Sequence, residues 1–410
     1  MERIDAELLI PGRGEPVRDA AVVIDGATIS YAGPAAGAPA TEGRTARRAA
    51  TVLPGLWDCH GHFMGSRSLD LARLAQEPVA VRAARCARDL ANALRAGVTS
   101  VREVGGLGVY LARVVREGTL DGPAIYAAGS VLSTTGGHGD LHCYPLSWVE
   151  DFSRTDGDLR LADGIAECMR AVREQLRRGA AVIKICASGG VLSEVDHPIH
   201  QQFTGAELRA IVEVAGLADR AVAAHCHGKP GIMAALEAGV TTIEHGTYLD
   251  EEACDAMRET GAILVPTRSI VESILADLDQ VPPYAAAKLT AIARTHAEAT
   301  ALAIERGVTV AMGTDISVTG LDRRNSWGTN GSELVHLVAL GMTPLAAIEA
   351  ATATAPRTLG PQAPRSGVLA AGYDADLITV DGDPLADISI LASPDRVTGV
   401  WTGGRQVKGD

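Results

Sequence analysis

The middle of the chain repeats one pattern of hydrophobic and polar positions. An amphipathic helix ends at a glycine, and a short apolar run rich in β-branched residues follows it at once. Four segments share this pattern, namely 94–101, 176–183, 236–243 and 304–311. A glycine after the last helical turn with an apolar run beyond it is typical of a helix that leads into a buried strand. Helices that alternate with buried strands predict a parallel sheet with crossover helices.

Eight apolar runs are candidate strands of that sheet. They end near residues 57, 104, 130, 186, 226, 245, 266 and 314. Eight parallel strands in a chain of 410 residues favour a (β/α)₈ TIM barrel over an open doubly wound sheet. No glycine-rich dinucleotide fingerprint follows the first strand, which also disfavours the open sheet.

The two ends of the chain have a different, β-rich character. Residues 20–24 and 27–31 flank Asp25-Gly26, which predicts a hairpin with a type I′ turn. Residues 376–380 and 397–402 are strand-like as well. We therefore expect both termini to meet in a small β-sandwich domain of residues 1–52 and 360–410, beside a barrel of residues 53–359.

The composition and charge of the chain are those of a globular enzyme. The chain is 47% hydrophobic and 21% charged, as in ordinary globular enzymes, and its net charge of −13 argues against a nucleic-acid partner. Its seven cysteines include no Cys-x-x-Cys pair, which indicates free thiols in a reducing compartment. No run approaches the roughly 18 apolar residues of a membrane span, and the N-terminus lacks a signal-peptide pattern. We therefore expect a cytoplasmic enzyme that does not bind membranes.

Metal-binding side chains stand where the active site of a barrel lies, at the carboxyl ends of the strands. The first candidate strand leads into His60-Gly61-His62, and side chains two apart on an extended chain share one face. Two imidazoles on one face can converge on one divalent ion. The other strand ends supply Lys184, His225, His227, His245 and Asp315. One such histidine is usually only hydrogen-bonded, but five strand ends with ligand chemistry together predict a metal site.

Lys184 interrupts the apolar run 181–186. An unpaired ammonium is expensive to bury. In one interpretation the side chain bends out of the barrel and pairs with Glu194 or Asp196. In the other it is a neutral amine that has reacted with CO₂, and the resulting carbamate bridges two metals as a glutamate would.

Taken together, these motifs resemble the amidohydrolase superfamily, in its binuclear branch with a carboxylated lysine. The resemblance covers essentially the whole chain. The segments that carry it are 54–62, 99–103, 135–140, 184–191, 243–246, 313–315 and 372–377.

The resemblance implies a ligand set for two divalent metal ions. The implied ligands are His60, His62 and Asp315 for the first ion, His225 and His245 for the second, and a carboxylated Lys184 that bridges both together with a water or hydroxide. Zinc is the usual metal, and Mn, Co or Fe also suit such mixed ligands.

The resemblance also implies a mechanism. The bridging hydroxide attacks an amide carbonyl, and Asp315, as general acid and base, passes a proton to the leaving amine. His138 is a candidate catalytic residue at the carbonyl oxygen and His227 a candidate contact to a substrate carboxylate, unless both only support the ligands. Further candidates for the substrate carboxylate are Arg102, Lys229, Arg323 and Arg324, each of which also fits a structural or solvated role.

Within the superfamily the chain resembles Xaa-Pro and Xaa-Arg dipeptidases and ochratoxin-type amide hydrolases, through residues 188–193, Asp196, Pro198, Gln202 and Phe203. This predicts cleavage of the C–N amide bond of a dipeptide or N-acyl amino acid. The peptidases often have a tyrosine where this chain has His227, and this departure leaves aryl amides and carbamates of xenobiotic or mycotoxin type open.

Three other functions share parts of this pattern. A single-metal deaminase or imidazolonepropionase-like hydrolase lacks the lysine found here at position 184. A non-catalytic scaffold would have lost ligands that this chain retains. Hydrolysis of lactones, cyclic amides or phosphotriesters stays open, because the same metal-activated hydroxide attacks those substrates. The expected partners are a small-molecule amide substrate and further copies of the chain, since the family often forms homo-oligomers.

Overall fold

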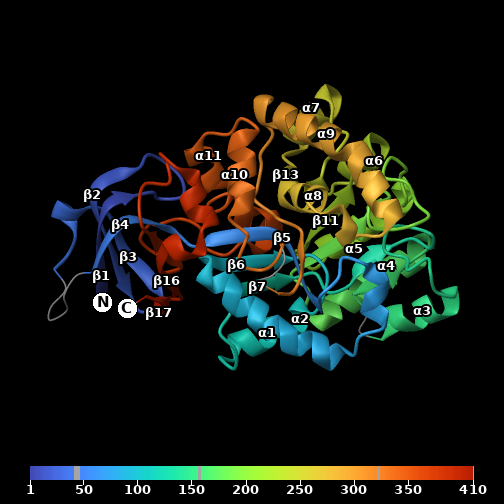
Figure 1. The fold of residues 1–410 in the computed structure, drawn as a ribbon, viewed down its shortest axis with the longest axis horizontal. Helices are drawn as coiled ribbons and strands as arrows, with labels where there is room; N and C mark the ends of the chain where they lie inside the picture. The colour runs from blue at the N-terminus through green and yellow to red at the C-terminus, as the bar shows by residue number, and fades with distance from the viewer. Residues whose placement is uncertain (41–46, 156–157, 321–323, 410) are drawn as a thin grey trace.

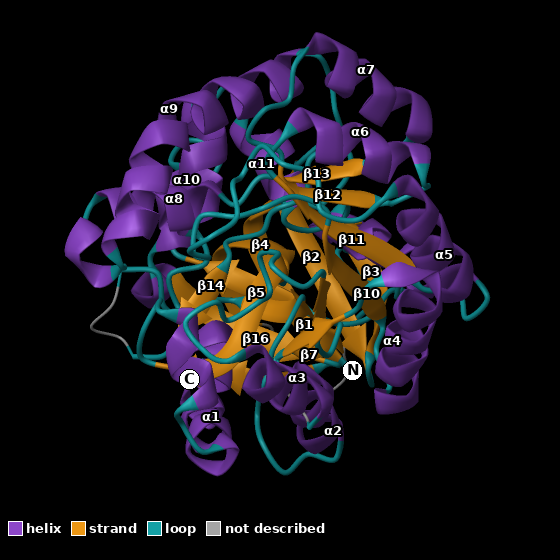
Figure 2. Ribbon diagram, turned by 90° about the vertical axis from the view of Figure 1, so that its right-hand side faces the viewer, coloured by secondary structure: helices purple, strands orange, loops and turns teal. Residues whose placement is uncertain are grey.

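The computed structural model describes residues 1–40, 47–155, 158–320 and 324–409. It consists of a small β-rich part, in which the two termini lie close together, and a larger α/β body (Figure 1). In the view at right angles to this one, the strands lie in the centre of the molecule and the helices surround them (Figure 2).

Both ends of the chain contribute to one seven-stranded sheet, in the order β17-β16-β15-β4-β1-β2-β3. Among the described strands of this sheet, β1 and β4 pair in parallel and all other neighbours pair antiparallel. The prediction that the termini meet is confirmed, although hydrogen bonds join the strands as one sheet where a two-sheet sandwich was expected. The strands are β1 Glu2–Leu9, β2 Val17–Asp25, β3 Thr28–Pro34, β4 Arg47–Pro54, β15 Leu377–Val380, β16 Val397–Thr402 and β17 Arg405–Lys408.

The predicted hairpin is formed by β2 and β3, but its turn is of another type. Asp25 pairs with Thr28, so the two-residue loop is Gly26-Ala27. Gly26 has φ +60°, whereas Ala27 is not among the described residues with positive φ. A positive φ at only the first loop position is the type II′ pattern, whereas type I′ requires it at both.

The body contains two parallel sheets, in the orders β13-β12-β11-β10-β8-β9 and β14-β5-β6-β7. These sheets confirm the predicted parallel α/β organisation. The strands are β5 Leu56–Ser66, β6 Val98–Glu103, β7 Ala124–Ala127, β8 Val131–Ser133, β9 Leu159–Leu161, β10 Val182–Cys186, β11 Ala221–Cys226, β12 Thr242–His245, β13 Ile263–Val265 and β14 Ile316–Val318.

The eighth expected strand, ending near residue 314, is not a regular strand. Val310 forms a single parallel bridge with Leu264, and β14 begins only after Asp315. The stretch between still bonds to both sheets, because Ala311 N donates to Leu264 O at 2.9 Å and Cys59 N donates to Met312 O at 2.8 Å. It runs so close to its neighbours that a Cβ on Gly313 would lie 2.4 Å from a Val265 methyl carbon.

The helices pack around these sheets. The glycine after each of the four repeated helices has a positive φ, at positions 97, 179, 239 and 307. A regular strand follows the first three of these glycines, whereas the segment after Gly307 forms only the single bridge of Val310. No helix in the described part of the chain is long and apolar enough to cross a membrane. The α-helices are α1 Val79–Arg95, α2 Gly108–Arg116, α3 Leu146–Arg154, α4 Gly164–Arg178, α5 Gly205–Gly216, α6 Lys229–Glu237, α7 Glu251–Thr260, α8 Arg268–Leu275, α9 Pro283–Glu305, α10 Ser332–Ala339 and α11 Pro344–Ala350.

Candidate metal centre and active site

The strand β5 presents two histidines to the interior of the body. His60 and His62 lie within this fully buried strand, two residues apart. The glycine between them is required, because a Cβ on Gly61 would lie 2.6 Å from the ring of Trp327. The alternation of the strand therefore directs both imidazoles to one side while the backbone packs against an indole ring.

The first cluster joins these histidines to Asp315. The Asp315 Oδ1 atom lies 3.6 Å from His60 Nε2 and 3.1 Å from His62 Nε2. The other ring nitrogens already have partners, because His60 Nδ1 lies 2.6 Å from Glu244 Oε2 and His62 Nδ1 lies 2.8 Å from Gly105 O. Burial lowers the pKa of His60 to about 4, which keeps it in the neutral form that binds metals.

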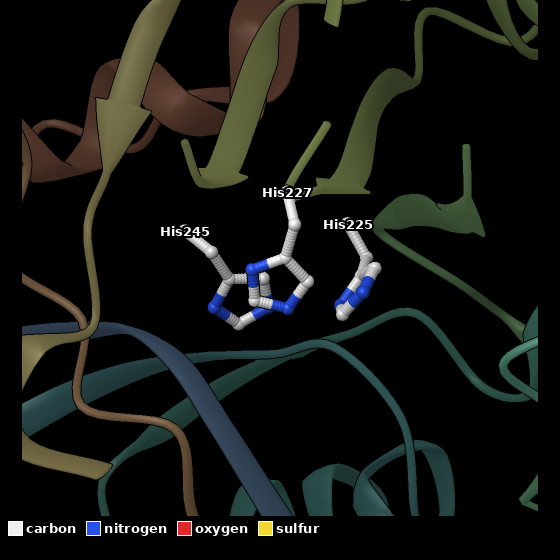
Figure 3. Close-up of side chains that lie close together, drawn as sticks. All are labelled: His225, His227 and His245. Atoms are coloured by element: carbon white, nitrogen blue, oxygen red, sulfur yellow. The ribbon is translucent and has the colours of Figure 1, made fainter. Parts of the chain in front are cut away.

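The second cluster consists of His225, His227 and His245 (Figure 3). His225 lies in β11, His227 follows that strand, and His245 ends β12. Each of the three offers a ligand atom within 4.8 Å of the others. Burial lowers the pKa of His227 to about 3, and the pKa values of His225 and His245 lie well below the usual range for the same reason.

Oxygen atoms behind the second cluster fix two of its rings. His227 Nδ1 lies 2.6 Å from Thr247 Oγ1, and His245 Nδ1 lies 2.7 Å from Thr267 Oγ1. Both rings therefore have their Nε2 atoms left for a ligand. Such outer hydrogen bonds are the usual means by which proteins orient metal-binding imidazoles.

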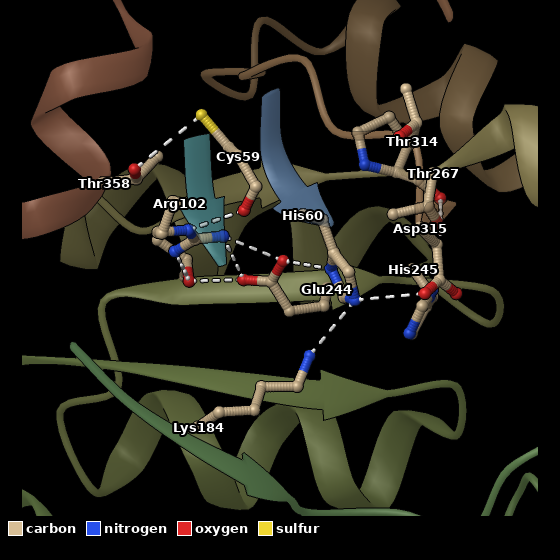
Figure 4. Close-up of polar contacts among 12 residues, drawn as sticks. Cys59, His60, Arg102, Lys184, Glu244, His245, Thr267, Thr314, Asp315 and Thr358 are labelled. Carbon is tan, nitrogen blue, oxygen red and sulfur yellow. Dashed lines mark hydrogen bonds and ion pairs between the residues drawn. The ribbon is translucent and has the colours of Figure 1, made fainter. Parts of the chain in front are cut away.

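Lys184 approaches the first cluster from β10. Its side chain is buried, and its Nζ lies 3.5 Å from His60 Nε2 (Figure 4). It forms no ion pair with an acidic residue of the described chain, and Asp196 pairs with Lys288 instead, at 3.3 Å. Burial lowers the pKa of the Lys184 amine. The first of the two sequence interpretations, an outward ion pair with Glu194 or Asp196, therefore does not describe this lysine.

The backbone is held in an unfavourable conformation at several points of the site. Five described non-glycine residues have a positive φ, and three of them, His245, Thr267 and Asp315, belong to the two clusters or support them. Non-glycine residues adopt this conformation only where the surrounding structure enforces it. The conformational free energy of these residues is therefore unfavourable, and packing of the surrounding structure must hold their side chains in place.

The two clusters and Lys184 lie at one cavity of about 100 Å³. Apolar side chains make up much of the rest of the lining, and two helices, α8 and α9, contribute five of them. We call these five residues the apolar wall. Its residues are Ile270, Val271 and Ile274 from α8 and Leu289 and Ile292 from α9. His138 and His296 also line the cavity, and its lining among the described residues includes no arginine.

Arg102 does not reach the cavity, which corrects the expectation that it contacts substrate. It is fully buried, and its guanidinium donates to Cys59 O at 2.6 Å, Thr242 Oγ1 at 2.8 Å and Glu244 Oε1 at 2.7 Å (Figure 4). Burial alone raises the pKa of Glu244, but Arg102 and the hydrogen bond with His60 outweigh it and hold that pKa below its usual range. Arg102 therefore acts indirectly: it holds the Glu244 carboxylate, which in turn bonds to Nδ1 of His60.

We expect Arg102→Met to lower the free energy of unfolding by about 3–5 kcal/mol, because it leaves the Glu244 carboxylate buried without its partner. Denaturant titration of the metal-free protein measures this change. Arg113→Met is the matched control, since Arg113 is 79% exposed and pairs with Glu117 on the surface of one helix. Equal, small effects of the two variants would contradict the buried ion pair.

Two further candidates for the substrate carboxylate, Lys229 and Arg324, also lie elsewhere. Lys229, at the start of α6, pairs with Asp250 at 2.5 Å and Glu252 at 2.6 Å and does not line the cavity. Arg323 lies outside the described residues. Arg324 is exposed and borders a separate surface pocket.

Sequence reasoning missed several residues that shape the site. Glu244 had a usable signal, because an acid inside the apolar run before His245 must have a partner. No such sequence signal marks Thr247, Thr267 or the residues of the apolar wall, because hydroxyl and aliphatic residues are common in every helix and loop. The seven cysteines are free, in agreement with the expected free thiols, and six of them are buried.

A family model described as "Amidohydrolase family" matches residues 51–407. The chain belongs to the amidohydrolase family. This amidohydrolase is 44% identical to ochratoxinase from Aspergillus niger, over 99% of the chain and 86% of the relative. The crystal structure of A. niger ochratoxinase has a TM-score of 0.95 and 43% identity, and covers 100% of this chain and 96% of the other.

A crystal structure described as a Xaa-Pro dipeptidase with bound methionine in the active site is also similar to this amidohydrolase. Its TM-score is 0.88 at 33% identity, and it covers 100% of both chains. These neighbours imply a TIM barrel with an additional domain, and the family implies a metal-dependent hydrolase of amide bonds. The two clusters are chemically suited to hold metal ions, because imidazole and carboxylate groups converge there. In four of the histidine rings the Nδ1 atom already has a hydrogen-bond partner, which leaves Nε2 for a metal.

Proposed function

We propose that this amidohydrolase cleaves the C–N amide bond of an N-acyl amino acid or dipeptide that carries a large apolar group. The observation that carries the proposal is one cavity that is lined both by the two ligand clusters and by the apolar wall. An apolar group buried against such a wall gains about 25 cal/mol per Å² removed from water. The ochratoxinase relative supports the class, since its name refers to a mycotoxin substrate.

Two divalent metal ions, most often zinc, would be held by His60, His62 and Asp315 and by His225 and His245. A carboxylated Lys184 would supply a further ligand to both ions, and the remaining histidine of the second cluster, His227, would be left for the substrate. When bound, such ions polarise a carbonyl and lower the pKa of water to about 7. The burial of Lys184 without an acidic partner supports the carbamate, because an uncharged amine is the form that reacts with CO₂.

Asp315 is proposed to carry the proton in this reaction. Burial raises its pKa, but the neighbouring His60 and the hydrogen bond with His62 outweigh burial and lower it on balance. Its carboxylate is therefore ionised near neutral pH and can accept a proton before it passes the proton to the leaving amine. His138 and His227 are proposed substrate contacts, because both line the cavity.

The finer features of the fold are proposals as well. We infer that the two body sheets form one (β/α)₈ barrel, supported by the backbone bonds of Ala311 and Met312 to both sheets. We place the barrel at residues 53–359 and the smaller domain at residues 1–52 and 360–410. A homo-oligomer is the proposed assembly.

The test is a substrate panel with the zinc-loaded enzyme and detection of released amines by mass spectrometry. The panel contains N-aroyl and N-acyl amino acids, dipeptides with large and small side chains, and aryl carbamates. We expect release of free amino acids, fastest from substrates with a large apolar acyl group. Cleavage of carbamates alone, or no cleavage of any amide by metal-loaded protein, would contradict the proposal.

A further inference from the structure

His138 is held by a chain of hydrogen bonds that leads away from the cavity. Its Nδ1 lies 2.8 Å from the hydroxyl oxygen of Ser193, and this hydroxyl forms a short hydrogen bond to Asp196 Oδ1. The ring of His138 stacks on that of His225 at a centroid distance of 4.2 Å. The position of the imidazole is thus fixed on one face by a ring and on its outer edge by a hydroxyl.

Donors surround the Asp196 carboxylate. Gly190 N donates to Oδ2 at 2.9 Å, and Gln202 Nε2 donates to the same atom at 3.1 Å. Lys288 Nζ lies 3.3 Å from Oδ1. The side chain of Asp196 is 6% exposed. A buried group that receives so many donors is an ionised carboxylate, because a protonated acid would lose an acceptor.

These contacts determine where the protons of the chain lie. An ionised Asp196 can only accept, so the hydroxyl proton of Ser193 must point to it. The Ser193 oxygen is then left as an acceptor for His138, and the proton between them must belong to Nδ1. In a neutral ring the Nε2 atom consequently carries a lone pair.

We propose that Ser193 and Asp196 are positioning residues that hold His138 in the Nδ1–H form, with the Nε2 lone pair left for the cavity. His138 then accepts a hydrogen bond from a substrate N–H or from water, whereas the sequence suggested a contact to the carbonyl oxygen, which requires a donor. This inference rests on the proposed function for its catalytic consequence, but the protonation pattern itself does not depend on any substrate.

Lys288 secures the same arrangement from α9. Besides Asp196, its Nζ donates to Gly190 O at 3.2 Å and to Ser193 O at 2.7 Å. Gly190 allows the close approach of the ring, because a Cβ there would lie 2.1 Å from His138 Nδ1. The helix α9, which supplies two of the five residues of the apolar wall, therefore also fixes the loop that orients His138.

The decisive variant is Asp196→Asn. Two donors at 2.9 and 3.1 Å, Gly190 N and Gln202 Nε2, would hold the new amide oxygen on their side against the single, longer contact of Lys288 at 3.3 Å, so that its NH₂ group faces Ser193. Ser193 would then accept from the amide and donate its own proton to His138 Nδ1. We expect His138 to change to the Nε2–H form in this variant.

The measurement is ¹⁵N NMR of histidine-labelled, zinc-loaded full-length enzyme, with His138→Gln to identify the signals. Wild type and Ser193→Thr should show a protonated Nδ1 at His138, and Asp196→Asn a protonated Nε2. Ser193→Ala should show a mixture. An unchanged Nδ1–H signal in Asp196→Asn would overturn the proposal, as would a protonated Nε2 in the wild type.

Kinetics supplies the second readout. We expect Ser193→Ala and Asp196→Asn to lower kcat about 10–100-fold, the usual scale for lost outer hydrogen bonds. The metal should stay bound in both variants, and KM should stay nearly constant. Ser193→Thr should retain most of kcat. Asp250→Asn is the matched control, because Asp250 also pairs with a lysine but lies outside the cavity. A Ser193→Thr variant as slow as Ser193→Ala would mean that only packing matters and would contradict the proposal.

The two proposals fail in different ways. If the enzyme releases no amine from any amide, the proposed function is wrong, and the NMR experiment still decides the protonation of His138. If amides are cleaved but the NMR pattern is the opposite one, only the role of Ser193 and Asp196 is wrong.

Discussion

Lys184→Ala is expected to lower kcat/KM about 10³-fold and to reduce the bound metal from two equivalents toward one or none. At 1.36 kcal/mol per tenfold, this loss equals about 4 kcal/mol of transition-state stabilisation. The reason is the place of Lys184, which is buried and 3.5 Å from His60 Nε2. A carbamate there would contribute two anionic oxygens among neutral imidazoles, and no other described side chain at that point could replace them.

Three measurements separate the carbamate from a merely structural lysine. Metal content by mass spectrometry should fall in Lys184→Ala, and short carboxylic acids such as acetate or propionate should restore part of both metal and activity. Lys408→Ala is the matched control, because the Lys408 amine donates to two backbone carbonyl oxygens, Arg95 O at the end of α1 and Pro394 O, and does not line the cavity. Full activity with full metal content in Lys184→Ala would eliminate the carbamate.

The sequence predicted the parts of the site that lie on strands. Strand periodicity alone places His60 and His62 on one face, and a barrel brings His225, His245 and Asp315 to the same end. These side chains do lie together, in two clusters of three with His227. The helix–glycine–strand junctions could be found in the same way, because a glycine with positive φ is a local requirement.

Features that depend on contacts between distant segments could not be predicted in this way. Arg102 appeared to be a substrate contact because its position at a strand end was known, but its partner Glu244 lies 142 residues away. The same limit applies to Lys288, which meets Asp196 across 92 residues. Whether a buried charge faces the cavity or another buried charge is decided by packing, which no local pattern records.

Replacement of Asp315 tests whether this residue is the general acid and base or only a metal ligand. We expect Asp315→Asn to keep the fold and lower kcat about 10²–10⁴-fold, the usual contribution of a positioned proton carrier. An amide oxygen can still accept bonds near His60 and His62, but it cannot take up a proton at neutral pH.

The leaving group decides between the two roles of Asp315. If Asp315 protonates the leaving amine, the loss in Asp315→Asn should be greatest for alkyl amides, whose leaving nitrogen is strongly basic and departs only when protonated. It should be smaller for nitroanilides, whose amine leaves with little help. Metal content is measured on the same samples, and comparison at equal occupancy removes the effect of weakened binding. A loss of equal size for both substrates would show that the carboxylate serves as a ligand alone, because ligand loss weakens the attack on every carbonyl alike.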